Sequence, residues 1–352
     1  MEMPDTPRLI FWELTKRCNL ACKHCRAEAA EMDYSGELDL DSAKKVIDDI
    51  TAFANPILVL TGGEPLYRDD VFDIARYAAS KQLRVALATN ATLIDEQCAR
   101  QIRQAGIARV SISIDGSKAA SHDDFRGIPG AFDAAVRGVR LLRGQGVAFQ
   151  FNTTVTRRNV GELEDILHFA ISEGAAALHL FMLVPVGCGV KIADTDMLSS
   201  KKYEDVLNWF YDRSKEISME LKATCAPHYY RVIRQRAREE GRRLSFEKDG
   251  MAAMTRGCLA GSGVCFISHR GDVQPCGYLP LVAGNVLREG IKKVWQESEL
   301  FLTLRDADRL GGKCGACGFR TVCGGCRARA YYATGGYLDE EPYCMYEPEG
   351  KG

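Results

Sequence analysis

The stretch Cys18-Asn19-Leu20-Ala21-Cys22-Lys23-His24-Cys25 places three cysteines close together, with three residues in the first gap and two in the second. Four thiolates would complete the coordination of an iron–sulfur cluster, whereas three leave one iron without a protein ligand. A small molecule can bind that open iron. Zinc sites differ, because they usually pair two CxxC-type halves and close with a fourth ligand. The triplet therefore favours an iron–sulfur cluster over a zinc knuckle or a pair of redox thiols.

The composition is that of an ordinary globular protein. The chain has 352 residues, 46% of them hydrophobic and 26% charged, which suits about two domains with a large core. The formal net charge of -1 gives no electrostatic footprint for nucleic acid or an anionic membrane. We see neither a signal peptide nor an apolar run of membrane-spanning length, and we expect a cytoplasmic protein. Fourteen cysteines in such a chain favour metal ligation over disulfides.

From residue 8 to about 185 the chain alternates β-rich runs with helical patterns. Six such repeats predict a parallel sheet and fit an open, partial TIM-like barrel of six β/α units. We assign residues 1–199 to this barrel, 200–257 to a bridging helical region and 258–352 to a cysteine-rich domain. The predicted strands are 8–15, 56–61, 83–89, 108–114, 147–155 and 177–184, and the predicted helices are 41–51, 71–80, 95–105, 131–143, 163–173 and 200–217.

Polar residues follow the predicted strands, where barrels of this kind carry their functional groups. The cysteine triplet follows the first strand, and Thr61-Gly62-Gly63-Glu64-Pro65 follows the second. The glycines of that second run allow the backbone to approach a ligand, and Glu64 can accept a hydrogen bond from an ammonium group. Turn, cap and surface roles are the plainer interpretation of each such residue taken singly. Further candidates, suited to a ribose or a carboxylate, are Asn90 after the third strand, Ser113 at the fourth and Asn152 within the fifth. Arg126, in the run 122–127, is a candidate clamp for a carboxylate.

The end of the chain is rich in cysteine. Eight cysteines fall between residues 258 and 344, which is enough for two fully ligated four-iron clusters. Structural zinc in two all-cysteine sites is the alternative, since all-thiolate sites suit both metals. We assign inert packing roles to three other cysteines, Cys98, Cys188 and Cys225, with contact to the substrate as the alternative for Cys188 and Cys225.

Together these motifs resemble the radical S-adenosylmethionine (SAM) enzymes that carry a SPASM extension. The resemblance implies that Cys18, Cys22 and Cys25 hold a [4Fe–4S] cluster whose open iron chelates SAM, and that reductive cleavage of SAM gives a 5′-deoxyadenosyl radical. The run 62–65 is similar to the family motif that contacts the methionine amino group. His24 stands where the family commonly has an aromatic ring beside the adenine. A low-potential electron donor such as ferredoxin or flavodoxin is implied as the reductant.

The later cysteines resemble the ligands of the SPASM domain, which holds one or two auxiliary [4Fe–4S] clusters. The sequence departs from many family members just before Cys326, where two residues stand in place of three. The ligand sets that the resemblance implies are Cys258, Cys265, Cys276 and Cys326 for one cluster and Cys314, Cys317, Cys323 and Cys344 for the other.

The second half most resembles the heme-forming branch of this family, in the siroheme-dependent pathway, on residues 8–15, 22–27, 224–230, 265–269, 273–277 and 324–331. That branch implies oxidative decarboxylation of two propionates of iron-coproporphyrin III to vinyl groups, which gives heme b, with an auxiliary cluster taking up the leftover electron. The rivals are removal of acetate side chains from a siroheme-derived tetrapyrrole and maturation of a peptide or sulfatase. Our candidate clamp for the substrate carboxylates is a cationic helix with His228, Arg231 and Arg234.

Overall fold

The computed structural model describes residues 5–249, 253 and 255–348, and its centre is one ten-stranded sheet in the order β10-β9-β8-β1-β2-β3-β4-β5-β6-β7. The strands from β8 through β1 to β7 run parallel, while β9 and β10 are antiparallel additions at one edge. The predicted partial barrel is confirmed. The strands are β1 Leu9–Glu13, β2 Ile57–Thr61, β3 Arg84–Thr89, β4 Arg109–Ser113, β5 Phe149–Val155, β6 Ala177–Met182, β7 Glu220–Thr224, β8 Val264–Ile267, β9 Asp272–Gln274 and β10 Gly284–Asn285.

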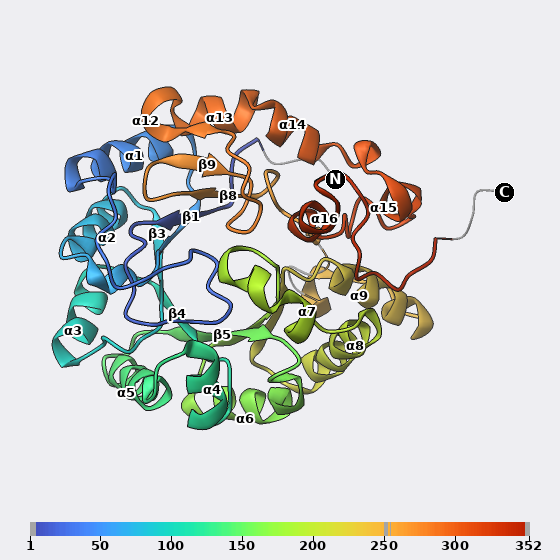
Figure 1. Ribbon diagram of the computed structural model, residues 1–352, viewed down its shortest axis with the longest axis horizontal. Coiled ribbons are helices and arrows are strands. Elements are labelled where there is room, and N and C mark those ends of the chain that lie inside the picture. Colours follow the sequence, from blue (N-terminus) through green and yellow to red (C-terminus); the bar gives the residue numbers. More distant parts are fainter. Residues whose placement is uncertain (1–4, 250–252, 254, 349–352) are drawn as a thin grey trace.

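Helices cover the outer face of the sheet, as Figure 1 shows for α1, α2, α3, α5 and α6. Helix α1 illustrates why: its buried Ala43, Val46, Ile47 and Ile50 repeat at the spacing of one helical face, which packs on the strands. The carboxylate of Asp39 caps its first turn. The helices up to residue 249 are α1 Leu40–Phe53, α2 Val71–Ser80, α3 Glu96–Gln104, α4 Ala119–Arg126, α5 Ala131–Gly144, α6 Leu163–Glu173, α7 Ala193–Asp196, α8 Ser200–Glu216, α9 His228–Glu239 and α10 Phe246–Asp249.

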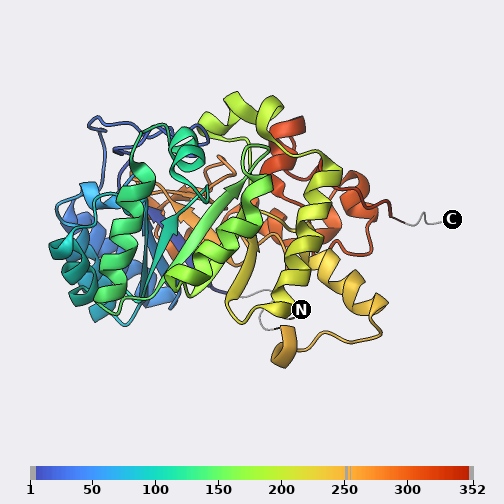
Figure 2. The same cartoon turned by 90° about the horizontal axis from the view of Figure 1, so that it is seen from below.

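The segment after residue 258 is joined to the barrel in two places. Its strand β8 pairs with β1, and the backbone N–H of Ile291 donates to Asp49 of α1 at 2.6 Å. On the other side, the Arg329 guanidinium of α16 donates to the Tyr203 hydroxyl of α8 at 2.9 Å, and Figure 2 shows the last helices beside α8 and α9. The helices of this segment are α12 Val286–Glu289, α13 Ile291–Glu297, α14 Glu299–Arg305, α15 Gly312–Ala316 and α16 Arg327–Thr334.

Within the ranges that the structure describes, we find no helix that combines the length and the apolar character needed to cross a membrane. The carboxyl ends of the parallel strands meet at one rim of the barrel, because all of these strands point the same way. The loop that carries the cysteine triplet and the loop that carries residues 61–65, here called the glycine run, therefore lie side by side at this rim.

Candidate active site

The triplet lies on the loop after β1, and its three cysteines line one cavity of about 200 Å³. Each sulfur has a nearby N–H donor. Cys18 accepts from the backbone N–H two residues further on at 3.4 Å, Cys25 from the N–H four residues further on at 3.4 Å, and Cys22 from the Arg126 guanidinium at 3.6 Å. Burial raises the pKa of Cys18 to about 12, so the charge of a bound metal cluster is what holds such a thiol as a thiolate. The donor set fits an iron–sulfur cluster.

The loop after β2 packs directly against the backbone of the triplet loop. A Cβ atom on Gly63 would lie 2.4 Å from the carbonyl oxygen of Arg17, so a side chain does not fit there without a shift of the backbone. Glu64 is fully buried, and its carboxylate accepts from the Thr89 hydroxyl at 2.7 Å and from the Asn90 N–H at 2.8 Å. Burial raises the pKa of Glu64 to about 7. Glu64 thus joins the ends of β2 and β3.

The other residues predicted to bind the cofactor line the cavity. Ser113 and Asn152 are register partners on β4 and β5, and both line the cavity. Glu64 is not among the residues that line the cavity, but its carboxylate accepts the hydrogen bond that holds the backbone of Asn90, which does line it. The predicted residues in the cavity wall are Gly62, Gly63, Asn90, Ser113, Arg126 and Asn152.

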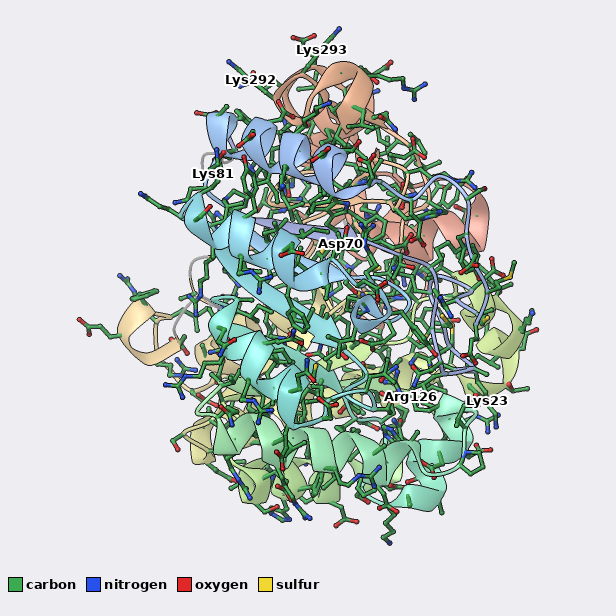
Figure 3. The ribbon with its side chains drawn as sticks, turned by 90° about the vertical axis from the view of Figure 1, so that its left-hand side faces the viewer. Lys23, Asp70, Lys81, Arg126, Lys292 and Lys293 are labelled. Carbon is green, nitrogen blue, oxygen red and sulfur yellow. The ribbon has the colours of Figure 1, made fainter. Side chains whose placement is uncertain are left out.

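A buried ion pair positions Arg126 at the cavity. Its guanidinium lies 2.5 Å from the carboxylate of Asp115, and Figure 3 shows Arg126 on the same side of the molecule as Lys23 of the triplet loop. The His24 ring stacks on Phe125 with a centroid separation of 4.1 Å, and burial lowers the pKa of His24 to about 4, so this ring is neutral. Among the described residues, neither Arg126 Nε nor His24 Nδ1 has a hydrogen-bond partner. A polar ligand such as SAM fits these two atoms.

Four of the later cysteines surround a second cavity, next to the first turns of α9. Backbone N–H groups lie 3.4 Å from the sulfur of Cys314, 3.3 Å from that of Cys317 and 3.4 Å from that of Cys323. Hydrogen bonds of this kind are typical of cluster ligands, whose potentials they tune. The four cysteines are Cys314, Cys317, Cys323 and Cys344.

Another group of thiols lies between the second cavity and the barrel. Cys276 is packed against the buried Cys326, and Cys258 is an electrostatic neighbour of both. The structure brings Cys225 to this group and does not bring Cys265, which lies on β8 within the main core. Cys225, which belongs to no cysteine motif of the sequence, is thus a neighbour of the predicted ligands Cys258, Cys276 and Cys326.

Two residues of the predicted carboxylate clamp, His228 and Arg231, line the second cavity, and no residue of the clamp lines the cavity beside the triplet. His228 is fully buried against the carboxylate of Glu341. The guanidinium of Arg231 donates to both carboxylate oxygens of Glu204, at 2.8 Å and 2.6 Å. Arg234 donates to a backbone carbonyl of its own helix. The three residues of the predicted clamp therefore lie outside the cavity beside the triplet.

Sequence reasoning missed a charged residue, Arg26, in the wall of the first cavity, the one beside the triplet. Arg26 lines the cavity, lies over the Phe266 ring at 4.5 Å and pairs with Glu13 at 2.8 Å. Glu13 also bonds His269 at 2.8 Å. Burial alone would raise the pKa of Glu13, but the His269 hydrogen bond and the charge of Arg26 lower it. A carboxylate at the end of an otherwise apolar strand is the signal that could have found this group.

Fold and site together define a radical SAM enzyme with an auxiliary iron–sulfur domain. Residues 12–170 match the Radical SAM superfamily, and residues 258–318 match SPASM, an iron-sulfur cluster-binding domain. The chain belongs to this family. The AdoMet-dependent heme synthase of Methanosarcina barkeri (strain Fusaro) is 50% identical over 349 residues, which cover 99% of each chain. The enzyme of the same name from Nitratidesulfovibrio vulgaris (strain Hildenborough) is 52% identical over 97% of this chain and 93% of its own.

The fold likeness extends to solved structures. Streptococcus suis SuiB bound to S-adenosylmethionine matches with a TM-score of 0.75 and 16% identity, over 97% of this chain and 78% of its own. Membership of the family implies a [4Fe–4S] cluster with SAM, and the SPASM domain implies auxiliary iron–sulfur clusters.

Proposed function

We propose that the protein converts iron-coproporphyrin III into heme b by oxidative decarboxylation of two propionate side chains to vinyl groups. Two relatives with half of their residues identical and nearly full coverage are named heme synthases, which supports a tetrapyrrole substrate. The cluster and SAM, when bound, supply a radical that abstracts hydrogen. We propose Cys18, Cys22 and Cys25 as the ligands of that cluster. The contacts of SAM that we propose are Gly62, Gly63, Asn90, Ser113, Arg126 and Asn152.

The chemistry sets three requirements on the protein. Loss of a hydrogen atom from the β-carbon of a propionate leaves a substrate radical, which releases CO2, forms the C=C bond and gives up one electron. The site therefore needs a cation for the carboxylates, an apolar wall for the ring and an electron acceptor beside it. A low-potential donor such as ferredoxin or flavodoxin is the reductant that we propose for SAM cleavage.

The cavity beside the triplet offers the first two of these features. Its wall includes the apolar or aromatic side chains of Phe181, Leu183, Val184 and Tyr278, which suit the face of a porphyrin. Arg26 supplies a cation on the same wall, held by an acidic partner and stacked on an aromatic ring. We propose Arg26 as a contact of a substrate propionate, in place of the helix α9 cations.

One observation carries the proposal most directly. Val184 and Tyr278 line the cavity, and the same two residues pack in the buried cluster that contains Cys276 and Cys326. A single layer of side chains thus separates the cavity from the thiols of an auxiliary site. An electron released by the substrate has an acceptor next to the place where it forms.

An isotope experiment tests the position of attack. We would supply iron-coproporphyrin III deuterated at the propionate β-carbons, with SAM and dithionite, to the anaerobically reconstituted protein. We expect one deuterium in each molecule of 5′-deoxyadenosine. Unlabelled 5′-deoxyadenosine from turning-over enzyme would contradict the proposal. Preferential turnover of a siroheme-derived tetrapyrrole that retains acetate groups would favour the rival reaction instead.

A further inference from the structure

We propose that Cys225, and not Cys265, is the fourth thiolate of the auxiliary site formed with Cys258, Cys276 and Cys326. Four cysteines complete a [4Fe–4S] cluster, and three of these four are ligands that the sequence resemblance already implied. The proposal concerns iron binding alone, so it stands or falls independently of the tetrapyrrole substrate.

The backbone delivers Cys225 to the other three thiols. It directly follows β7, at the rim where the parallel strands end, and its carbonyl oxygen accepts from the Tyr203 hydroxyl at 3.3 Å. Its side chain packs, with Cys276, against the buried cluster that includes Cys326. Its electrostatic neighbours are the thiols of Cys326, Cys276 and Cys258. Four cysteines from separate segments are therefore neighbours at this place.

The register of β8 turns Cys265 away from that place. Cys265 pairs with Ile10, whose side chain is fully buried in the main core, and the adjoining Phe266 lies under Arg26 of the cavity wall. Successive side chains of a strand point to opposite faces. Cys265 therefore faces the helix layer, fully buried, with Arg305 of α14 as its charged neighbour.

The surroundings of Cys225 also provide a positive charge. A cluster with four thiolates carries net negative charge, which is costly to bury without a counter-ion. Arg329 is fully buried and is an electrostatic neighbour of both Cys225 and Cys326. Its guanidinium donates to the Tyr203 hydroxyl at 2.9 Å and to the buried Glu341 carboxylate at 3.0 Å, and Glu341 also lies against His228. The same tyrosine donates to the Cys225 carbonyl, so one chain of contacts fixes both the ligand and the counter-charge.

The assignment changes how the auxiliary site is built. Cys225 lies outside residues 258–318, which match the SPASM domain, and it belongs to the connection between β7 and α9. One ligand thus comes from the barrel side of the molecule. We infer that this cluster fastens the barrel to the C-terminal segment, close to the Tyr278 wall of the first cavity.

The structure suggests a variant that removes the thiol with little effect on folding. Cys225 has φ +53°, in the left-handed region that glycine adopts without strain, so Cys225→Gly keeps the backbone conformation. Cys265→Val is the matched control, because it replaces a buried strand thiol by a strand-forming side chain of similar size. Both changes would be made in the full chain with Cys18, Cys22 and Cys25 replaced by alanine, so that the remaining iron belongs to the auxiliary sites.

Iron, zinc and acid-labile sulfide would be measured after anaerobic reconstitution, together with the EPR spectrum after reduction. We expect Cys225→Gly to lose about four iron and four sulfide ions per chain and one reduced-cluster signal, and Cys265→Val to keep them. Added ethanethiol should restore iron to the glycine variant. Full iron in Cys225→Gly, loss of iron from Cys265→Val, failure of the thiol to restore iron to a variant with native circular dichroism, or zinc in place of iron would each overturn the assignment.

Discussion

The guanidinium of Arg126 lies 2.5 Å from the carboxylate of Asp115, and both side chains are buried. The pair joins α4 to the end of β4 and brings Arg126 within 3.6 Å of the Cys22 sulfur. Burial opposes ionisation of Asp115, but the charge of Arg126, the neighbouring histidines and the Thr154 N–H together outweigh it and lower the pKa of Asp115. The cation is therefore held in place by the protein itself, before any ligand arrives.

Asp115→Asn should weaken both the fold and SAM binding. It leaves a buried guanidinium without its counter-charge, which costs about 3–5 kcal/mol. We expect a lower unfolding temperature and a SAM dissociation constant raised at least about tenfold, measured anaerobically by equilibrium dialysis. Asp124→Asn, on the helix α4 that carries Arg126, is the control, because the contacts of Asp124 with Lys23 and Arg158 are exposed and their loss should cost less than about 1 kcal/mol. Equal effects of the two variants would contradict this role.

Gly63→Ala should displace the loop that packs on the triplet. The added Cβ would lie 2.4 Å from the Arg17 carbonyl oxygen and 2.6 Å from that of Lys16, so the backbone must shift. We expect at least about a tenfold loss of SAM affinity. Gly144→Ala is the control, since a Cβ there meets nothing within 4 Å and alanine favours the end of α5. Wild-type SAM affinity in Gly63→Ala would show that the close contact is unimportant.

Arg26→Ala should weaken substrate binding selectively. It removes the cation on the cavity wall, and we expect the dissociation constant of iron-coproporphyrin III to rise at least about tenfold, read from the porphyrin absorption spectrum. Arg234→Ala should leave this constant unchanged, because Arg234 bonds a backbone carbonyl of its own helix outside the cavity. The opposite ranking of the two variants would restore the clamp on α9 that the sequence suggested.

The barrel could be predicted from the sequence because its strands and helices carry strong, repeated patterns. The predicted helices 71–80 and 163–173 coincide with α2 and α6, and the six predicted strands all correspond to observed ones. Strands β7 and β8 were not predicted. The first is a short run with Glu220 and Lys222 on its exposed face, and the second lies in a segment whose cysteine suggested a ligand loop. Their strand conformation follows from pairing with β6 and β1, which the local sequence does not encode.

Several residues that line the first cavity could be placed from the sequence because they lie in or just after predicted strands, as Gly62, Asn90 and Ser113 do. The partners of α9 could not. Its cations stand out in the sequence, but Glu204 lies far before them and Glu341 far after them, and only the fold brings these acids to Arg231 and His228. The same limit applies to Cys225, which lies far from its neighbouring thiols along the chain.

The central claim is that each radical generated at the triplet abstracts hydrogen from one propionate, and that two propionates of one porphyrin react in this way. The direct measurement is the mass of the tetrapyrrole and the amount of 5′-deoxyadenosine after anaerobic turnover of iron-coproporphyrin III with SAM and dithionite. We predict two successive mass losses, each of one CO2 and two hydrogens, with heme b as the end product. Two molecules of 5′-deoxyadenosine should form for each heme. Cleavage of SAM with a tetrapyrrole of unchanged mass would contradict the account.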